Sequence, residues 1–151
     1  MTLPHNTDDR VTPEQLEVWR LFIRIHSQVL RRLEIDLTDR HSLPLAWYDV
    51  LARLLEADGR RLRMSELADR VMLSPSGLTR LVDRMAEEGL VERVSAEGDG
   101  RGFYAVLTDA GYDRLRDATG THLRGVRDYV IGRFSDEELR TMSNLLGRIE
   151  A

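Results

Sequence analysis

The chain of 151 residues contains no cysteine and no lysine. Without cysteine, disulfides, thiolate metal sites and redox sensing by thiols are excluded. No apolar run approaches the roughly 20 residues that a membrane-spanning helix needs, and residues 1–6 lack the charged and apolar regions of a secretion signal. We therefore expect a cytoplasmic protein with no membrane partner.

The sequence also lacks the signatures of catalysis and of metal binding. It holds no G-x-x-x-x-G-K-[ST] phosphate loop, no G-x-S-x-G nucleophile turn and no H-E-x-x-H zinc helix. The four histidines do not have the spacing of metal ligands: His5, His26, His41 and His122. We therefore expect that the protein is not an enzyme and that it binds neither a metal nor a cofactor.

Residues 65–88 have the pattern of two helices joined by a short turn. The first is expected over residues 65–72, with Ser65 as its N-cap. A second helix is predicted to begin at Ser74, with Pro75 at the first helical position and Gly89 as its stop. Four apolar residues recur on one side of it at positions i, i+3, i+4 and i+7: Leu78, Leu81, Val82 and Met85.

The opposite face of this second helix carries short hydroxyls and arginines in its N-terminal half. Side chains of these types can contact base edges in a DNA major groove, so we expect Ser74, Ser76, Thr79 and Arg80 to contact bases and nearby phosphates, and Arg84 to contact a phosphate. Ser74 has a second, compatible interpretation as a helix cap. The alternative for Thr79 and Arg80 is an ordinary solvated helix face.

Two predicted strands, over residues 90–94 and 103–107, flank a glycine-rich tip and form a β-hairpin, the wing. Arg101 is expected to enter the minor groove, where narrow A·T-rich stretches concentrate negative potential. Asp99 and Gly102 are expected to support the wing, Asp99 by holding a nearby arginine. Residues 60–64 are predicted to add a third strand, and their arginines are either phosphate contacts or a solvated charge run.

These motifs resemble those of one family. Residues 73–84, followed by Gly89-Leu90-Val91, are similar to the recognition helix of the MarR family of bacterial transcriptional regulators. Residues 99–102, followed by Leu107-Thr108, match that family's D-x-R-G … L-T wing pattern, and the resemblance extends from about Pro13 to Ile149. It implies a homodimer that binds double-stranded DNA, with two recognition helices in successive major grooves of a pseudo-palindromic operator.

The predicted fold class is mainly α with a small β-wing: a winged helix-turn-helix lobe plus N- and C-terminal dimerisation helices. Residues 1–11 are expected to form a flexible arm and residues 12–151 a single domain. Within that domain we expect a DNA-binding lobe at about 45–108, the helix-turn-helix at about 65–88, the wing at about 90–107, and dimerisation helices at about 12–40 and 109–150. Within residues 109–150 we expect two helices, a long one that reaches about Phe134 and a final one that begins with a capping box at Ser135.

The resemblance also implies regulation, because many members of the family release DNA when a small aromatic or lipophilic anion binds where the dimerisation helices meet the DNA-binding lobe. Six residues are candidates to line such a cleft: Trp19, Arg24, His26, His41, Trp47 and Tyr48. Core packing is the competing interpretation of the aromatic residues among them. We expect the protein to act as a repressor that such a ligand releases.

The net charge of −4 is unusual for a DNA-binding protein, because neutralised phosphates usually supply much of the affinity. Between residues 62 and 107, six arginines accompany eight acids. A positively charged DNA-binding surface must therefore come from where these arginines are placed and not from their number. All 22 basic residues are arginine, which suits forked contacts to phosphate and guanine. The acidic balance favours one alternative, a winged-helix protein-interaction module without specific DNA binding, but Ser76, Thr79, Arg80 and Arg101 favour DNA.

Overall fold

The structure, a computed structural model, describes residues 11–71, 73–96 and 102–150. Its helices are α1 (Pro13–His41), α2 (Leu45–Glu56), α3 (Met64–Val71), α4 (Pro75–Glu87), α5 (Asp109–Tyr129) and α6 (Asp136–Glu150), with short 3-10 turns at Asp58–Arg60 and Ile131–Arg133. The strands are β1 (Arg61–Arg63), β2 (Val91–Ser95) and β3 (Phe103–Leu107). The predicted fold class, mainly α with a small β-wing, is confirmed.

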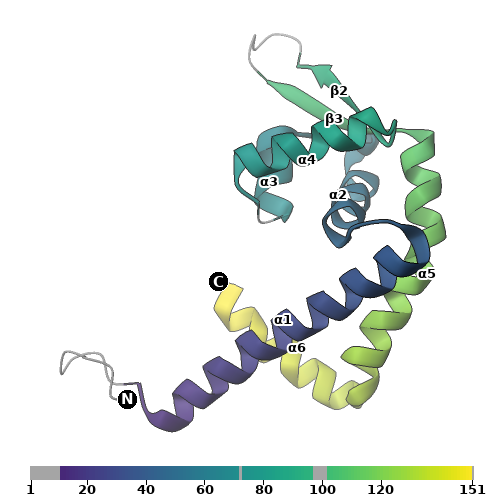
Figure 1. Cartoon of the computed structure of the whole chain (residues 1–151). Coiled ribbons are helices and arrows are strands. Elements are labelled where there is room, and N and C mark those ends of the chain that lie inside the picture. The colour runs from purple at the N-terminus through teal and green to yellow at the C-terminus, as the bar shows by residue number, and fades with distance from the viewer. Residues whose placement is uncertain (1–10, 72, 97–101, 151) are drawn as a thin grey trace.

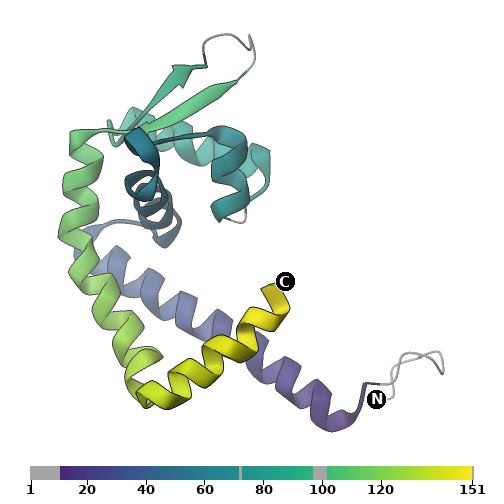
Figure 2. The ribbon, with the colours of Figure 1, turned by 180° about the vertical axis from the view of Figure 1, so that it is seen from behind.

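The elements form a compact lobe from which long helices extend (Figure 1). The lobe contains α2, α3, α4 and the sheet, whereas α5 runs from the sheet to the far end of the molecule, where α6 begins. The reverse view shows the same arrangement, with α1 and α6 extending beyond the lobe (Figure 2). In the residues described, no helix combines the length and the apolar character needed to cross a membrane.

Local capping signals set most of the helix ends. Thr12 accepts a hydrogen bond from the N–H of Gln15 at 3.3 Å, and the Gln15 side chain accepts one from the N–H of Thr12 at 2.9 Å. The predicted box at Ser135 is confirmed in the same way, since Ser135 and Glu138 each accept from the other's N–H. These reciprocal bonds satisfy N–H groups that the first turn of a helix leaves without an intrahelical partner.

Two predicted helix ends were wrong. Helix α3 begins at Met64, so Ser65 lies inside it, and the Glu66 carboxylate accepts from the N–H of Arg63 at 3.1 Å in place of the expected serine cap. Helix α5 ends at Tyr129 instead of continuing to about Phe134. The residues that follow, Val130, Ile131 and Gly132, all have weaker helix propensity than alanine or leucine.

The sheet is antiparallel with strand order β1-β3-β2. Arg61 pairs with Val106, Val91 with Leu107, and Ser95 with Phe103. The predicted third strand beside the wing is therefore confirmed, and β3 is the central strand.

The hydrophobic core lies under this sheet and is built mainly by α2, α3 and α4. Its largest fully buried side chains include Leu51, Leu54, Leu67, Leu78, Val82, Met85 and Val91. By contrast, α6 buries no residue and α1 buries only Leu33 and Leu37. The core thus fixes the lobe, while most of α1 and α6 lie outside it.

Candidate nucleic-acid interface

Helix α4 presents one side to the core and the other to solvent. Leu78, Leu81, Val82 and Met85 are each no more than 6% exposed, as the spacing predicted. On the other side Ser76, Arg80 and Arg84 are exposed and Thr79 is half-buried. The face predicted to read DNA is therefore accessible, and its rotation about the helix axis is set by four anchored apolar residues.

The start of α4 is fixed by Ser74. The Ser74 Oγ atom accepts a hydrogen bond from the N–H of Gly77 at 3.2 Å, and it lies 3.5 Å from the Ser76 Oγ atom. The predicted cap is thus confirmed, and it holds both hydroxyls at the helix N-terminus, where the dipole favours a phosphate. At the other end Gly89 has φ of 74°, the left-handed conformation that favours glycine after a helix.

The wing strands are joined to α4 by an ion pair that sequence reasoning missed. The Arg93 Nη1 atom of β2 lies 2.7 Å from the Asp83 Oδ1 atom of α4. The same guanidinium lies over the Phe103 ring of β3, 4.6 Å from its centroid. Strand alternation was the available signal, since it places Arg93 on the same side of β2 as the buried Val91.

A hollow of about 320 Å³ separates α4 from the strands. Its lining comes from β1, α3, α4 and both wing strands: Arg63, Met64, Ser65, Thr79, Arg93, Gly102 and Phe103. Two guanidinium groups line this space, and one of them, that of Arg93, is paired with the Asp83 carboxylate.

The arginines of β1 contact aromatic rings, an interpretation that sequence reasoning did not consider. Arg61 and Arg63 both lie over the Tyr104 ring, at 4.9 and 5.5 Å, and the Arg63 Nε atom donates to the Tyr104 hydroxyl at 3.3 Å. Arg60 lies over the Tyr112 ring at 4.8 Å. These contacts hold the guanidinium groups against the outer part of the lobe.

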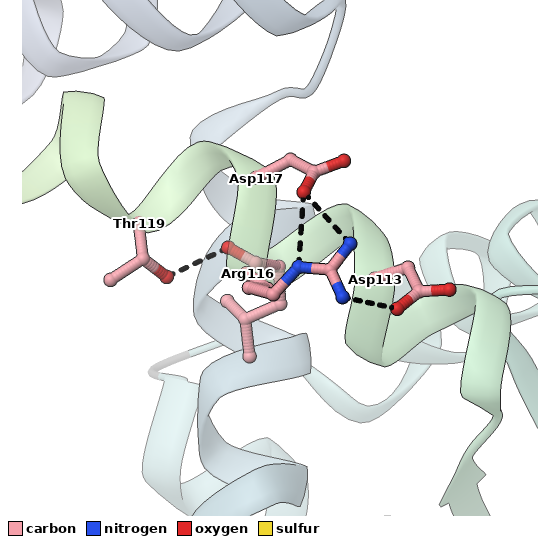
Figure 3. Close-up of polar contacts among 5 residues, drawn as sticks. Asp113, Arg116, Asp117 and Thr119 are labelled. Atoms are coloured by element: carbon pink, nitrogen blue, oxygen red, sulfur yellow. Dashed lines mark hydrogen bonds and ion pairs between the residues drawn. The ribbon is translucent and has the colours of Figure 1, made fainter.

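Acids outside the lobe are paired with arginines of their own. On α5, Arg116 lies 2.9 Å from Asp113 and 3.1 Å from Asp117, all three on the exposed surface (Figure 3). The hydrogen bond to Asp117, with the charges of both carboxylates, raises the pKa of Arg116. Part of the negative charge of the chain is thus neutralised away from α4 and the wing.

The wing tip itself lies partly outside the described residues, as do the predicted site residues Asp99 and Arg101. Gly102 is described, and its carbonyl accepts from the N–H of Ala96 at 2.8 Å. This bond extends the pairing of β2 with β3 by one residue towards the tip.

The six candidate cleft residues fall into two groups. Trp19, Arg24 and His26 lie on the exposed part of α1, where Trp19 is 58% exposed. The other group lies where the end of α1 and the start of α2 meet α5: Trp47 and Tyr48 are buried in the core, and the His41 Nε2 atom lies 2.8 Å from the Thr121 Oγ1 atom. One copy of the chain does not bring the two groups together.

The second group borders a half-buried polar pair, His122 and Asp49. The Tyr48 ring stacks on the His122 ring with centroids 4.3 Å apart. Burial lowers the pKa of His122 below its ordinary value, and the nearby Asp49 carboxylate opposes this shift. Burial also raises the pKa of Asp49. Within the described part of the chain, no group of three or more His, Asp or Glu side chains could hold a metal ion.

An exposed recognition helix packed beside a three-stranded antiparallel sheet that contains the wing defines a winged helix-turn-helix protein. Residues 41–102 match the model of the MarR family. The regulator PecS of Dickeya dadantii (strain 3937) is 30% identical over 112 residues, 74% of this chain and 67% of PecS. The repressor YetL of Bacillus subtilis (strain 168) is 31% identical over 100 residues, 66% of this chain and 59% of YetL.

A solved structure agrees over nearly the whole chain. Sco3205, a MarR family transcriptional regulator from Streptomyces coelicolor crystallised in complex with DNA, is 32% identical with a TM-score of 0.87, covering 93% of this chain and 89% of its own. The chain belongs to the MarR family of transcriptional regulators. It is a regulator and not an enzyme.

Proposed function

We propose that this regulator is a homodimeric repressor that binds a pseudo-palindromic operator in double-stranded DNA. The observation that carries the proposal is the solvent-facing side of α4, which carries Ser76, Thr79 and Arg80. The apolar residues on the opposite side of this helix are buried in the core. Sco3205, crystallised with DNA, and YetL, named a repressor, support it.

Each residue of the interface has a proposed part. Ser76, Thr79 and Arg80 contact base edges, Arg80 through a forked contact to guanine, which discriminates against a wrong base by about 1–3 kcal/mol. Ser74 and Arg84 contact phosphates and fix the register of the helix. Arg101 enters the minor groove.

The dimer is proposed from apolar surface that one copy leaves uncovered. On α6, Leu145, Leu146 and Ile149 are 50%, 43% and 75% exposed, and Leu145 and Leu146 line an open hollow of about 660 Å³. The exposed apolar residues of α1 include Val18, Trp19, Leu21, Phe22, Ile23 and Ile25. Patches of this kind mark interaction sites, and a second copy would supply the same apolar surface in return.

The decisive experiment selects purified protein against random DNA duplexes at a stated salt concentration. We expect enrichment of a two-fold-related motif with half-sites about ten base pairs apart. If no motif is enriched, specific DNA binding is contradicted, and the alternative of a protein-interaction module is favoured. Transcription from a promoter carrying the selected site, with and without the protein, then tests repression.

We further propose that a small aromatic or lipophilic anion releases the DNA. Trp19, Trp47 and Tyr48 offer aromatic surface, while Arg24, His26 and His41 offer groups that can pair with an anion. The chain has two tryptophans, both in this set, so their fluorescence reports binding directly. Titration with aromatic carboxylates should quench this fluorescence and lower operator affinity at the same concentrations; carboxylates that leave both signals unchanged would contradict the proposal.

A further inference from the structure

The ion pair between Asp83 and Arg93 joins the recognition helix to the wing. Its N–O distance is 2.7 Å, and the two side chains are 45% and 31% exposed. The ring of Phe103 lies against the same guanidinium. A single side chain of β2 thus contacts α4 and β3, two elements that the proposed function requires to act on the same DNA.

The position of Asp83 on α4 makes this ion pair important for the proposed DNA binding. It lies four residues after Thr79 and three after Arg80, so it shares their side of the helix. An uncompensated carboxylate there would face the phosphates and oppose binding. Arg93 neutralises this carboxylate from the neighbouring strand β2.

We infer that Arg93 is a positioning residue for DNA reading. It fixes the angle between α4 and the wing strands, so that helix and wing reach their grooves in one arrangement without reorganising on binding. Its guanidinium binds the Asp83 carboxylate and packs against the Phe103 ring, and it does not contact a phosphate. The inference rests on the proposed function, since it concerns how that same interface is held.

A phosphate contact by Arg93 is the competing role, and the two roles predict opposite signs for one substitution. If Arg93 positions α4, then Asp83→Asn breaks the pair and weakens binding, although it removes a negative charge from the DNA side. If Arg93 contacts a phosphate, then Asp83→Asn releases it from its acid and strengthens binding.

The test compares Asp83→Asn, Arg93→Gln and the swapped pair Asp83→Arg with Arg93→Asp. Asp113→Asn and Arg116→Gln are matched controls, because they make the same charge changes in an exposed ion pair of α5 (Figure 3). Affinities are measured for the selected operator and for a random duplex over a series of salt concentrations.

We expect each single variant to weaken operator binding by about tenfold, within the range of coupling between contacting residues. Asp83→Asn should leave binding to the random duplex unchanged, whereas Arg93→Gln should weaken it because the Asp83 carboxylate is left uncompensated. The swapped pair should return to within about threefold of the original protein. Unchanged or tighter operator binding by Asp83→Asn would overturn the inference. So would a salt slope lowered by about one phosphate in Arg93→Gln, or a swapped pair no better than the single variants.

A second measurement needs no DNA. Amide hydrogen exchange of the free protein should be faster in residues 91–95 and 103–107 of Asp83→Asn than of Asp113→Asn, because the strands lose their tie to α4. Equal exchange would overturn the inference. If the unaltered protein selects no operator, the proposed function fails, and exchange alone still decides whether the pair holds α4 to the wing.

Discussion

Some side chains in this protein have two roles. Ser74 caps α4, and we propose that its hydroxyl also contacts a phosphate. Arg93 neutralises an acid of α4 and covers an aromatic ring of β3. Arg80, in contrast, is exposed on the face that we assign to DNA. At this scale the assignments can be separated by exchanging one residue at a time.

Replacing Arg80 by alanine should weaken operator binding by about 1–3 kcal/mol, because a forked contact to guanine is lost. Binding to random DNA should change less, since a base contact carries sequence information. The measurement is the operator dissociation constant at fixed salt, with Arg116→Ala as the control of equal charge. A dimer that retains full operator affinity without Arg80 would contradict the proposed role.

The half-buried ring of His122 predicts a pH dependence of stability. Its pKa is lowered by burial in the folded chain, whereas the unfolded chain takes up the proton at the ordinary value near 6.5. Below pH 6.5 the unfolded state therefore binds more protons, and the free energy of unfolding falls as the pH falls towards the lowered pKa.

Urea unfolding of the original protein and of His122→Phe between pH 7.5 and 5.5 checks this. Phenylalanine keeps a ring against Tyr48 but does not titrate, so the variant should lose less stability over this interval. Equal losses in both proteins would show that His122 is not responsible.

Helix α5 approaches a neighbouring backbone segment closely at a glycine. A Cβ atom at Gly111, in the first turn of α5, would lie 2.1 Å from the Leu90 carbonyl oxygen. The same junction is held by Thr108, which accepts from the N–H of Gly111 and donates to the carbonyl of Gly89. The start of α5 is therefore locked to the turn after α4, which connects the recognition helix to the long helix behind it.

Gly111→Ala should destabilise the protein by about 1–3 kcal/mol, because the backbone must shift to admit a methyl group. Gly120→Ala is the control on the same helix: it is exposed, and its Cβ atom would meet only the end of Arg124 at 3.5 Å. The control should stabilise by about 0.5–1 kcal/mol, the helix preference of alanine over glycine. Urea unfolding at one protein concentration measures both, and a neutral Gly111→Ala would show that the contact yields easily.

As a whole, the molecule consists of a lobe with its own core and long helices that leave apolar surface uncovered. The lobe presents the recognition helix and the wing, while α1 and α6 extend away from it (Figure 2). If two copies bury these helices together, the spacing of their recognition helices follows from the dimer, and so does the spacing of the half-sites.

Leu146→Glu should weaken dimerisation by about tenfold or more, because a buried leucine contributes about 1.5–3 kcal/mol. Asn144→Glu adds the same charge on the opposite side of α6 and should leave the dimer intact. Sedimentation velocity over a concentration series measures both, with operator affinity expected to fall only for Leu146→Glu. An unaffected dimer in Leu146→Glu would place the interface elsewhere.

Local signals along the chain were enough to predict most of the fold. The capping box at Ser135, the N-cap at Ser74 and the stop at Gly89 each depend on a few consecutive residues, and all were confirmed. The buried face of α4 and the strands of the wing were confirmed too, because helical and strand periodicity shows in short stretches of sequence. The family resemblance rests on these same local motifs.

The remaining features came from contacts between residues far apart in the chain, which only the folded structure specifies. The pairing of β1 with β3 carries the chain directly into α3 at Met64, and Glu66 replaced Ser65 in the cap. The stacking of Tyr48 on His122 and the ion pair of Asp83 with Arg93 join separate elements. Such contacts depend on the angles at which elements pack, and short-range patterns of residue type do not encode those angles.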